Sequence, residues 1–205
     1  MWLTTSDGVR LYAVESGEGD IAVVLAHQGG SDLCGWLPYV ATLDDAGIRT
    51  LAFDFRGWGR SDHPSTDALA LGHDLEAAVA RARDDGATKV FLMGASMGGA
   101  AVVQNSAAIQ VDGRVSLSGT RLRSGYGIND PKGVAGLRGP FLYVGSRDDF
   151  RAPYPEVLQI FARVGSRDKE KVLYPGSQHG WDLVEFSSDA SRTRALILRW
   201  IRDHS

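Results

Sequence analysis

Short apolar stretches alternate with longer amphipathic ones along most of the chain. The first continuous apolar stretch is Ile21–Ala26, and stretches of similar length follow at Ile48–Phe53, Lys89–Met93, Arg114–Leu117, Pro140–Val144 and Glu170–Tyr174. Apolar runs of this length are typical of strands that are covered on both faces. Ala68–Arg83 instead has its apolar residues three and four positions apart, which indicates a helix that buries one face. The pattern therefore predicts strands that alternate with helices.

The same alternation predicts the class of fold. The helices are expected at Trp36–Ala46, Ala68–Arg83, Met97–Ala108, Pro155–Val164 and Ser191–Asp203. A helix between two strands returns the chain so that the strands pair in parallel. Trp2–Thr5 and Val9–Glu15, joined by a turn at Ser6–Gly8, predict an antiparallel hairpin at the sheet edge. We expect an α/β fold with a doubly wound, mostly parallel sheet, helices on both faces and this N-terminal hairpin.

The expected fold also indicates where to look for chemistry. In a doubly wound sheet, ligands bind beyond the carboxyl ends of the strands, in the loops that follow them. The long connection Thr120–Gly139 has no clear periodic pattern and is too short for a separate lid domain. We therefore expect a single domain over residues 1–205, with an open site at one edge of the sheet.

Composition and charge exclude several classes of function. The chain has 205 residues, of which 43% are hydrophobic, and its formal net charge is −3, so no nucleic-acid partner is expected. Cys34 is its one cysteine, and no His-x-x-x-His pair is present, so we expect no disulfide, metal or cofactor. No apolar run approaches the roughly 20 residues of a membrane span, and Met1–Arg10 lacks the apolar segment of a signal peptide. We expect a cytoplasmic protein; its oligomeric state is not indicated.

The most informative motif is Gly94-Ala95-Ser96-Met97-Gly98, which lies between an apolar strand and a predicted helix. A sharp strand-to-helix turn needs small residues beside the serine, whose hydroxyl then projects into the site. The helix N-terminus places the Met97 amide where it favours a developing negative charge. The motif therefore predicts that Ser96 is a nucleophile and that Met97 contributes to an oxyanion hole.

A serine nucleophile needs a base, and the base usually needs a carboxylate that orients it. His179 lies in a glycine-flanked loop after the Glu170–Tyr174 strand, so it meets this need best among the five histidines. Asp148 and Asp149 both follow the Pro140–Val144 strand, and either can serve the imidazole. Capping of the next helix, or pairing with Arg147 and Arg151, is the alternative role of these aspartates.

In these motifs the chain resembles the α/β-hydrolase superfamily, and within it the serine hydrolases with minimal or no cap domain. The order Ser, Asp, His is the order of that fold. The resemblance favours Asp148 as the third triad member, because the family has its acid three residues after the glycine that corresponds to Gly145. Asp54-Phe55-Arg56-Gly57-Trp58-Gly59-Arg60-Ser61 also resembles a family segment, and its role there is mainly structural.

The resemblance extends to the loop after the first buried strand. His27-Gln28-Gly29-Gly30 is similar to the family's His-Gly loop, whose backbone supplies the second oxyanion donor. Gln28 stands where the family usually has glycine, so Gly29 is the expected donor and Gln28 the alternative. The resemblance implies a structural role for His27. Gln28, Trp36 and Trp181 are candidates for substrate binding, although large aromatic residues are also common in a core.

Together, these residues predict a carboxylesterase-like hydrolase of class EC 3.1.1. A small-molecule acyl substrate would be cleaved through the triad Ser96, Asp148 and His179 and an acyl-enzyme intermediate. Two alternatives stay open. One is a non-catalytic binding protein of the same fold, because fold does not determine function. The other is a cofactor-free perhydrolase, in which peroxide replaces water and the triad is the same.

Overall fold

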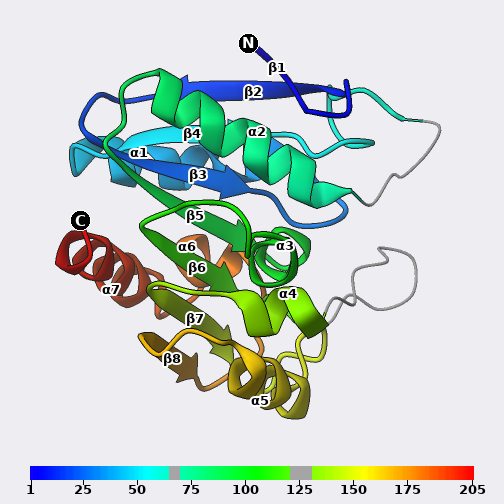
Figure 1. Ribbon diagram of the computed structural model, residues 1–205. Helices are drawn as coiled ribbons and strands as arrows, with labels where there is room; N and C mark the ends of the chain where they lie inside the picture. The colour runs from blue at the N-terminus through cyan, green and yellow to red at the C-terminus, as the bar shows by residue number, and fades with distance from the viewer. Residues whose placement is uncertain (65–69, 121–130) are drawn as a thin grey trace.

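The fold is built around one eight-stranded sheet. The computed structural model describes residues 1–64, 70–120 and 131–205 (Figure 1). The spatial order of the strands is β1-β2-β4-β3-β5-β6-β7-β8. In chain order they are β1 (Trp2–Thr4), β2 (Arg10–Ser16), β3 (Ile21–Ala26), β4 (Arg49–Phe53), β5 (Lys89–Ala95), β6 (Gly113–Leu117), β7 (Phe141–Ser146) and β8 (Lys169–Tyr174).

Strand pairing confirms the predicted class of fold. β1 pairs antiparallel with β2, and β2 pairs antiparallel with β4, whereas every pair from β4 to β8 is parallel. The register of β3 on β5 runs from Ile21 opposite Lys89 to Ala26 opposite Gly94. Because these strands are parallel, their carboxyl ends lie at one edge of the sheet, and the loops that follow them meet there.

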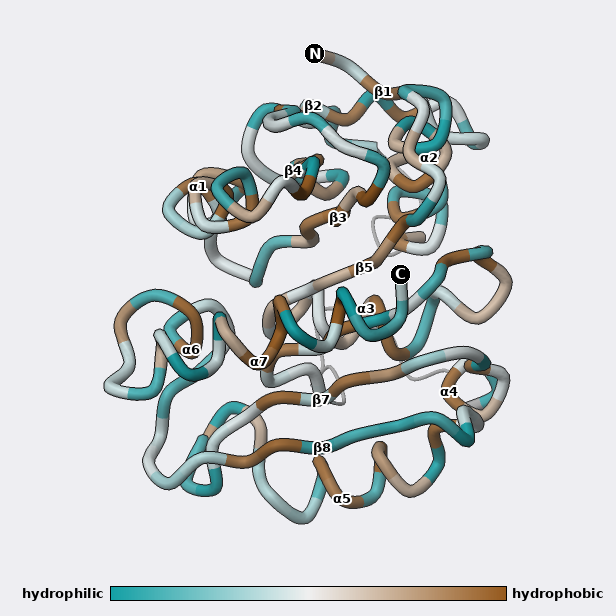
Figure 2. The backbone as a smooth tube through the Cα atoms, turned by 90° about the vertical axis from the view of Figure 1, so that its left-hand side faces the viewer, coloured by the Kyte–Doolittle hydropathy of each residue, from teal (hydrophilic) through white to brown (hydrophobic). Residues whose placement is uncertain are grey.

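Helices cover both faces of this sheet. Their bounds are η1 (Leu33–Trp36), α1 (Leu37–Asp45), α2 (Leu71–Asp84), α3 (Met97–Asn105), α4 (Pro131–Gly136), α5 (Tyr154–Arg163), α6 (Asp182–Glu185) and α7 (Ala190–Asp203). Side chains of α1, α6 and α7 pack on one face, and side chains of α2 to α5 pack on the other. Figure 2 shows α1 and α6 on one side of the sheet and α2 and α4 on the other.

The period-two alternation of the central strands explains this double packing. Val23 and Leu25 of β3 belong to the core beneath α1 and α7, whereas Ala22 and Val24 belong to the core beneath α2 and α3. All four side chains are fully buried. A strand with apolar residues at every position is stable only where both faces are covered, which is why the apolar runs predicted a doubly wound sheet.

Several predicted elements differ from the structure in length. The helix expected at Trp36–Ala46 is divided into η1 and α1, and the helix expected at Met97–Ala108 ends at Asn105. The helix predicted at Ala68–Arg83 corresponds to α2, which runs from Leu71 to Asp84. The first two predicted residues belong to residues 65–69, which lie outside the described residues. The short helices α4 and α6 were not predicted, because one helical turn carries too little periodicity to be detected.

No separate lid domain was expected, because the connection Thr120–Gly139 is too short to form one. Residues 121–130 of this connection lie outside the described residues, and α4 occupies part of the remainder. In the described part of the chain no separate lid is evident, and this part forms one sheet with its helices. Within residues 1–64, 70–120 and 131–205, no helix is both long and apolar enough to cross a bilayer.

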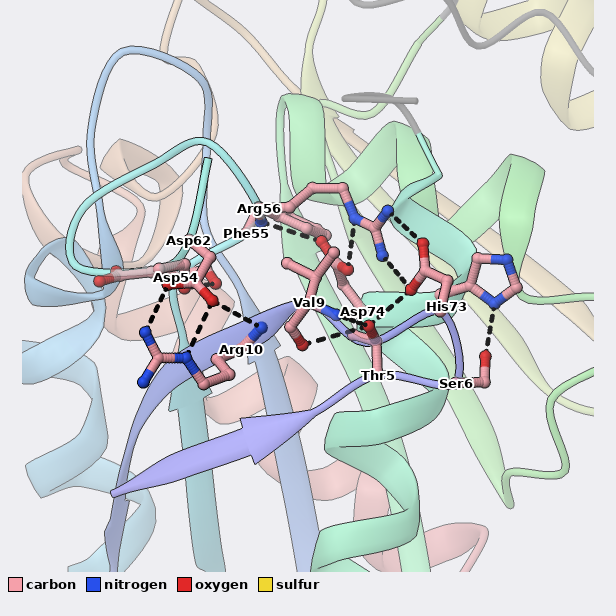
Figure 3. A network of polar contacts seen from close by, with 12 residues as sticks. Thr5, Ser6, Val9, Arg10, Asp54, Phe55, Arg56, Asp62, His73 and Asp74 are labelled. Carbon is pink, nitrogen blue, oxygen red and sulfur yellow. Dashed lines mark hydrogen bonds and ion pairs between the residues drawn. The ribbon is translucent and has the colours of Figure 1, made fainter. Parts of the chain in front are cut away.

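A buried ionic network joins the N-terminal hairpin to the loop after β4 (Figure 3). The Arg56 side chain is fully buried, and its guanidinium donates to Asp74 of α2 at 2.8 Å and to Asp7 of the hairpin turn at 2.7 Å. The Arg56 guanidinium holds the pKa of Asp7 well below its usual range. These contacts agree with the structural role that the resemblance implies for this segment.

This network predicts an acid-sensitive contribution to stability. Asp7→Asn is expected to lower the free energy of unfolding at neutral pH by on the order of 2 kcal/mol, because buried Arg56 loses a charged partner. A lowered folded-state pKa stabilises the fold above the unfolded pKa of about 3.9, and that contribution declines progressively as the pH falls from there through the folded-state pKa. Urea denaturation should therefore show a larger difference between wild type and variant at pH 7 than at pH 3.

Asp62→Asn is the matched control for this prediction. Asp62 pairs with Arg10 at 3.0 Å, but both side chains are exposed, so its loss should change stability less at either pH. A difference between wild type and Asp7→Asn that is the same at pH 7 and pH 3 would contradict the assignment.

Candidate active site

Ser96 lies in a sharp turn between β5 and α3. Its backbone has φ 49° and ψ −107°, a conformation that side-chain-bearing residues rarely adopt. Strain of this kind is common at functional sites, where the surrounding structure compensates for it. Ser96 is half-buried, whereas Ala95 and Met97 on either side are buried. The turn therefore leaves the serine as the accessible residue of the motif.

The two motif glycines allow this turn for steric reasons. A Cβ atom at Gly94 would lie 2.3 Å from the carbonyl carbon of Gly98, and a Cβ atom at Gly98 would lie 2.2 Å from the carbonyl oxygen of Ala26. Neither distance is possible between unbonded heavy atoms. The Gly98 amide also donates to the His27 carbonyl at 3.1 Å, which holds the start of α3 against the end of β3.

Three side chains from separate loops form a continuous hydrogen-bonded chain. The His179 Nε2 atom lies 2.7 Å from the Ser96 Oγ atom, and the His179 Nδ1 atom lies 2.6 Å from the Asp149 Oδ2 atom. A carboxylate accepts from the Nδ1–H, so Nε2 is left as the acceptor for the serine hydroxyl. Asp149 is 2% exposed and His179 is 7% exposed. Both are thus shielded from water, which strengthens their interaction.

The expectation that Asp148 contacts His179 is wrong, and Asp149 makes this contact. The Asp148 amide donates to the Gly176 carbonyl at 2.9 Å, and its side chain is exposed. The Asp149 Oδ1 atom instead accepts from the amides of Arg151 at 2.9 Å and Ala152 at 3.2 Å. These bonds fix the carboxylate with its other oxygen toward His179. The aspartate left open as the alternative therefore occupies the position.

The two expected oxyanion donors lie in the segments that the prediction named. Met97 is the first residue of α3, where a backbone amide has no acceptor within the helix. Gly29 is half-buried in the loop after β3, two residues after His27, whose carbonyl accepts from the Gly98 amide of α3. The side chain of Met97 is buried in the core, so only its backbone can serve the site.

His27 holds this loop through both ring nitrogens. Its Nδ1 atom lies 2.8 Å from the Gln28 carbonyl oxygen, and the Phe55 amide donates to its Nε2 atom at 3.0 Å. The ring must therefore carry its hydrogen on Nδ1. Burial lowers the pKa of His27, which favours this neutral form. These contacts support the structural role expected for His27.

Asp54 stabilises the same loop from the end of β4. Its carboxylate accepts from the amides of Leu33 and Arg60, both at 2.8 Å, and it is 2% exposed. Gly59, at φ 51°, is required here because a Cβ atom would lie 2.2 Å from the Asp54 carboxylate. Asp54 thus connects the β4 loop to the chain that follows Gly29.

The candidate substrate-binding residues are placed differently from one another. Trp36 is fully buried and packs in the core against Tyr39 and Trp181, so it does not line an accessible pocket. Trp181 is 9% exposed, and its ring lies against Gly35. Gln28 is half-buried, and its side-chain oxygen lies near Gly180, the residue that follows His179. Gln28 is therefore the polar member of the three at this site.

Comparison with known protein families identifies the family to which this chain belongs. A profile described as "Alpha/beta hydrolase family" matches residues 23–201. The chain belongs to the alpha/beta hydrolase family. Membership supports a hydrolytic activity. A 96-residue segment is 34% identical to the 2-hydroxy-6-oxononadienedioate/2-hydroxy-6-oxononatrienedioate hydrolase of Escherichia coli, and this match covers 44% of this chain and only 33% of that enzyme's length.

Solved structures share the fold of this alpha/beta hydrolase at low sequence identity. An esterase of Pyrococcus furiosus superposes with a TM-score of 0.86 at 18% identity, covering 100% of this chain and 90% of that one. A thermophilic esterase of Thermogutta terrifontis gives 0.80 at 18%, covering 100% and 98%. The enol-lactonase of Burkholderia xenovorans gives 0.80 at 15%, covering 98% and 100%. At these identities the similarity concerns the fold.

Proposed function

We propose that this protein is a serine hydrolase that cleaves carboxylic esters through Ser96, His179 and Asp149. The hydrogen-bonded chain from Ser96 through His179 to Asp149 is the observation that carries the proposal. A serine hydroxyl becomes a useful nucleophile when an adjacent base accepts its proton. The half-buried serine with an imidazole nitrogen at 2.7 Å meets that requirement.

In the first half of the reaction, the Ser96 oxygen attacks the ester carbonyl and His179 accepts the serine proton. The negatively charged Asp149 stabilises the imidazolium that forms. The backbone amides of Met97 and Gly29 are the proposed donors to the oxyanion. His179 then gives its proton to the departing alcohol, and an acyl group remains on Ser96.

In the second half, water hydrolyses the acyl-enzyme. His179 removes a proton from the water, which attacks the acyl carbonyl, and the acid leaves when the serine recovers its proton. The names of the structurally similar proteins, two esterases and an enol-lactonase, support a substrate with a carboxylic ester bond. The strained turn at Ser96 supports the choice of nucleophile.

Labelling with a fluorophosphonate tests this proposal without a choice of substrate. Wild-type protein is expected to gain the mass of one phosphonyl group, because the Ser96 oxygen bonds to phosphorus while the phosphorus–fluorine bond breaks and fluoride leaves. Intact-mass spectrometry should show this single adduct on the wild type and none on Ser96→Ala.

Ser118→Ala is the matched control for this labelling. Ser118 follows β6 and is the other non-glycine residue with positive φ among the described residues, at 52°, but it is 1% exposed. This variant should be labelled as fast as the wild type. A folded wild type without an adduct would contradict the proposal and would favour a binding protein of the same fold.

A further inference from the structure

The Gln28 side chain lies between the backbone segments that carry the two reacting residues. The β3–β5 register ends with Ala26 opposite Gly94, and Gln28 and Ser96 each lie two residues beyond this pair. On the other side, a Cβ atom at Gly180 would lie 2.1 Å from the Gln28 Oε1 atom and 3.6 Å from the Ala95 side chain. Gln28 is therefore next to the neighbours of both Ser96 and His179.

The orientation of Gln28 is held by its surroundings. His27 Nδ1 donates to the Gln28 carbonyl oxygen at 2.8 Å, and the preceding carbonyl accepts from Gly98. Gly180, at φ 61°, lacks a side chain where the Gln28 amide approaches. Any larger residue at position 180 would displace this amide. The loop after His179 thus leaves room for the Gln28 side chain.

The Gln28 amide has an unsatisfied polar atom at this place. Its Oε1 atom is buried and has no hydrogen-bond partner among the described residues. The oxygen and nitrogen of a side-chain amide exchange places when the group turns by 180°, so a polar atom is unpaired in either orientation. Most buried polar groups in proteins are paired, and an exception requires an explanation.

An apolar side chain lies next to this amide. The Ala95 Cβ atom is 3.6 Å from the point at Gly180 that the Gln28 Oε1 atom approaches, and Ala95 belongs to the hydrophobic cluster on this face of the sheet. Sites for small molecules are mostly apolar, and a few polar groups in them determine orientation and specificity. An amide with an unpaired atom, next to Ala95 and so to the residue before the nucleophile, fits that description.

We propose that Gln28 selects acyl groups that carry an oxygen atom on the carbon next to the reacting carbonyl, by hydrogen bonding to that oxygen through its side-chain amide. This inference rests on the proposed ester hydrolysis. Substrates with an α-ether or α-hydroxyl oxygen pair with the amide, whereas aliphatic acyl groups of the same size leave it unpaired. A site with a polar group for the substrate discriminates against analogues that lack the partner.

Two isosteric esters test the selection. p-Nitrophenyl methoxyacetate and p-nitrophenyl butyrate have acyl chains of equal length and the same leaving group, and they differ by an oxygen in place of a methylene. The quantity to measure is the ratio of kcat/KM for the two esters, compared between variants. This comparison cancels the higher intrinsic reactivity of the methoxyacetate.

Gln28→Leu is expected to lower this ratio about tenfold, which corresponds to the loss of one hydrogen bond to the substrate. Gln178→Leu is the matched control: the same substitution lies beside His179, but the Gln178 amide oxygen already accepts from Ser146 at 3.3 Å. Its ratio should equal that of the wild type. Gln28→Ala should reproduce the effect if Gln28→Leu does not fold.

The other outcomes overturn the inference in distinguishable ways. An unchanged ratio in a folded Gln28 variant, or an equal loss of activity toward both esters, means that Gln28 acts through packing rather than selection. If the wild type is labelled by the fluorophosphonate but its kcat/KM ratio is no higher than that of Gln28→Leu, the result contradicts the inference alone. A wild type that neither hydrolyses the esters nor is labelled contradicts the proposed function as well.

Discussion

Replacement of Ser96 by alanine is expected to lower the kcat for p-nitrophenyl butyrate by roughly 10⁴-fold or more. The variant loses the atom that forms the acyl-enzyme, and water must then attack the ester directly. His179→Ala should cost nearly as much, because the hydroxyl at 2.7 Å from the imidazole loses its proton acceptor. The two losses should not add in the double variant, since residues of a triad act as a unit.

Initial rates under saturating substrate, with circular dichroism and thermal unfolding on the same samples, measure this prediction. Ser96→Ala removes one oxygen from a half-buried position and should leave the fold intact. Activity in a folded Ser96→Ala protein above about one-hundredth of the wild-type kcat would assign the nucleophile to another residue. Multiplying losses in the double variant would show that Ser96 and His179 act independently.

Most of the fold could be predicted because its strands have a strong signal. Each of the eight predicted strands is present. The signal is strongest for the central strands β3 to β7, since a strand buried on both faces must be apolar at nearly every position. The boundaries were less accurate. β5 continues through Gly94 and Ala95 beyond its predicted end at Met93, because pairing with β6 extends the strand through residues that have no β propensity of their own.

The site was predicted as far as local sequence determines it. Ser96 is identified by glycines that have a steric function on either side, so the motif and the geometry are directly linked. Trp36 was a candidate for the pocket but lies in the core, because its environment depends on Tyr39 of α1 and on Trp181, which precedes α6. Packing between distant elements cannot be deduced from an aromatic residue alone.

The choice between Asp148 and Asp149 also depends on a contact between residues that are distant in sequence. The two aspartates are adjacent in the turn after β7, where strand alternation no longer determines which side chain faces the site. The bond from the Asp148 amide to Gly176 directs its side chain outward and that of Asp149 inward. Gly176 is in a loop that is distant in sequence, so the residues around Gly145 do not reveal the outcome.

Asp149→Asn is expected to lower kcat by about 10³- to 10⁴-fold, while Asp148→Asn stays within about threefold of the wild type. In Asp149→Asn, the amide oxygen can keep the bonds from Arg151 and Ala152, which directs the NH₂ group toward His179. A donor at that position forces the imidazole hydrogen onto Nε2. The ring then cannot accept the Ser96 proton.

The adjacent pair makes this measurement informative, because both substitutions are chemically identical and only one reaches the imidazole. Fluorophosphonate labelling should be slowed in Asp149→Asn and unchanged in Asp148→Asn. Equal losses of kcat in the two variants would mean that activity depends on the negative charge of this turn rather than on the contact between Asp149 and His179 Nδ1. A loss confined to Asp148→Asn would restore the family spacing and would require the turn after β7 to rearrange when substrate binds.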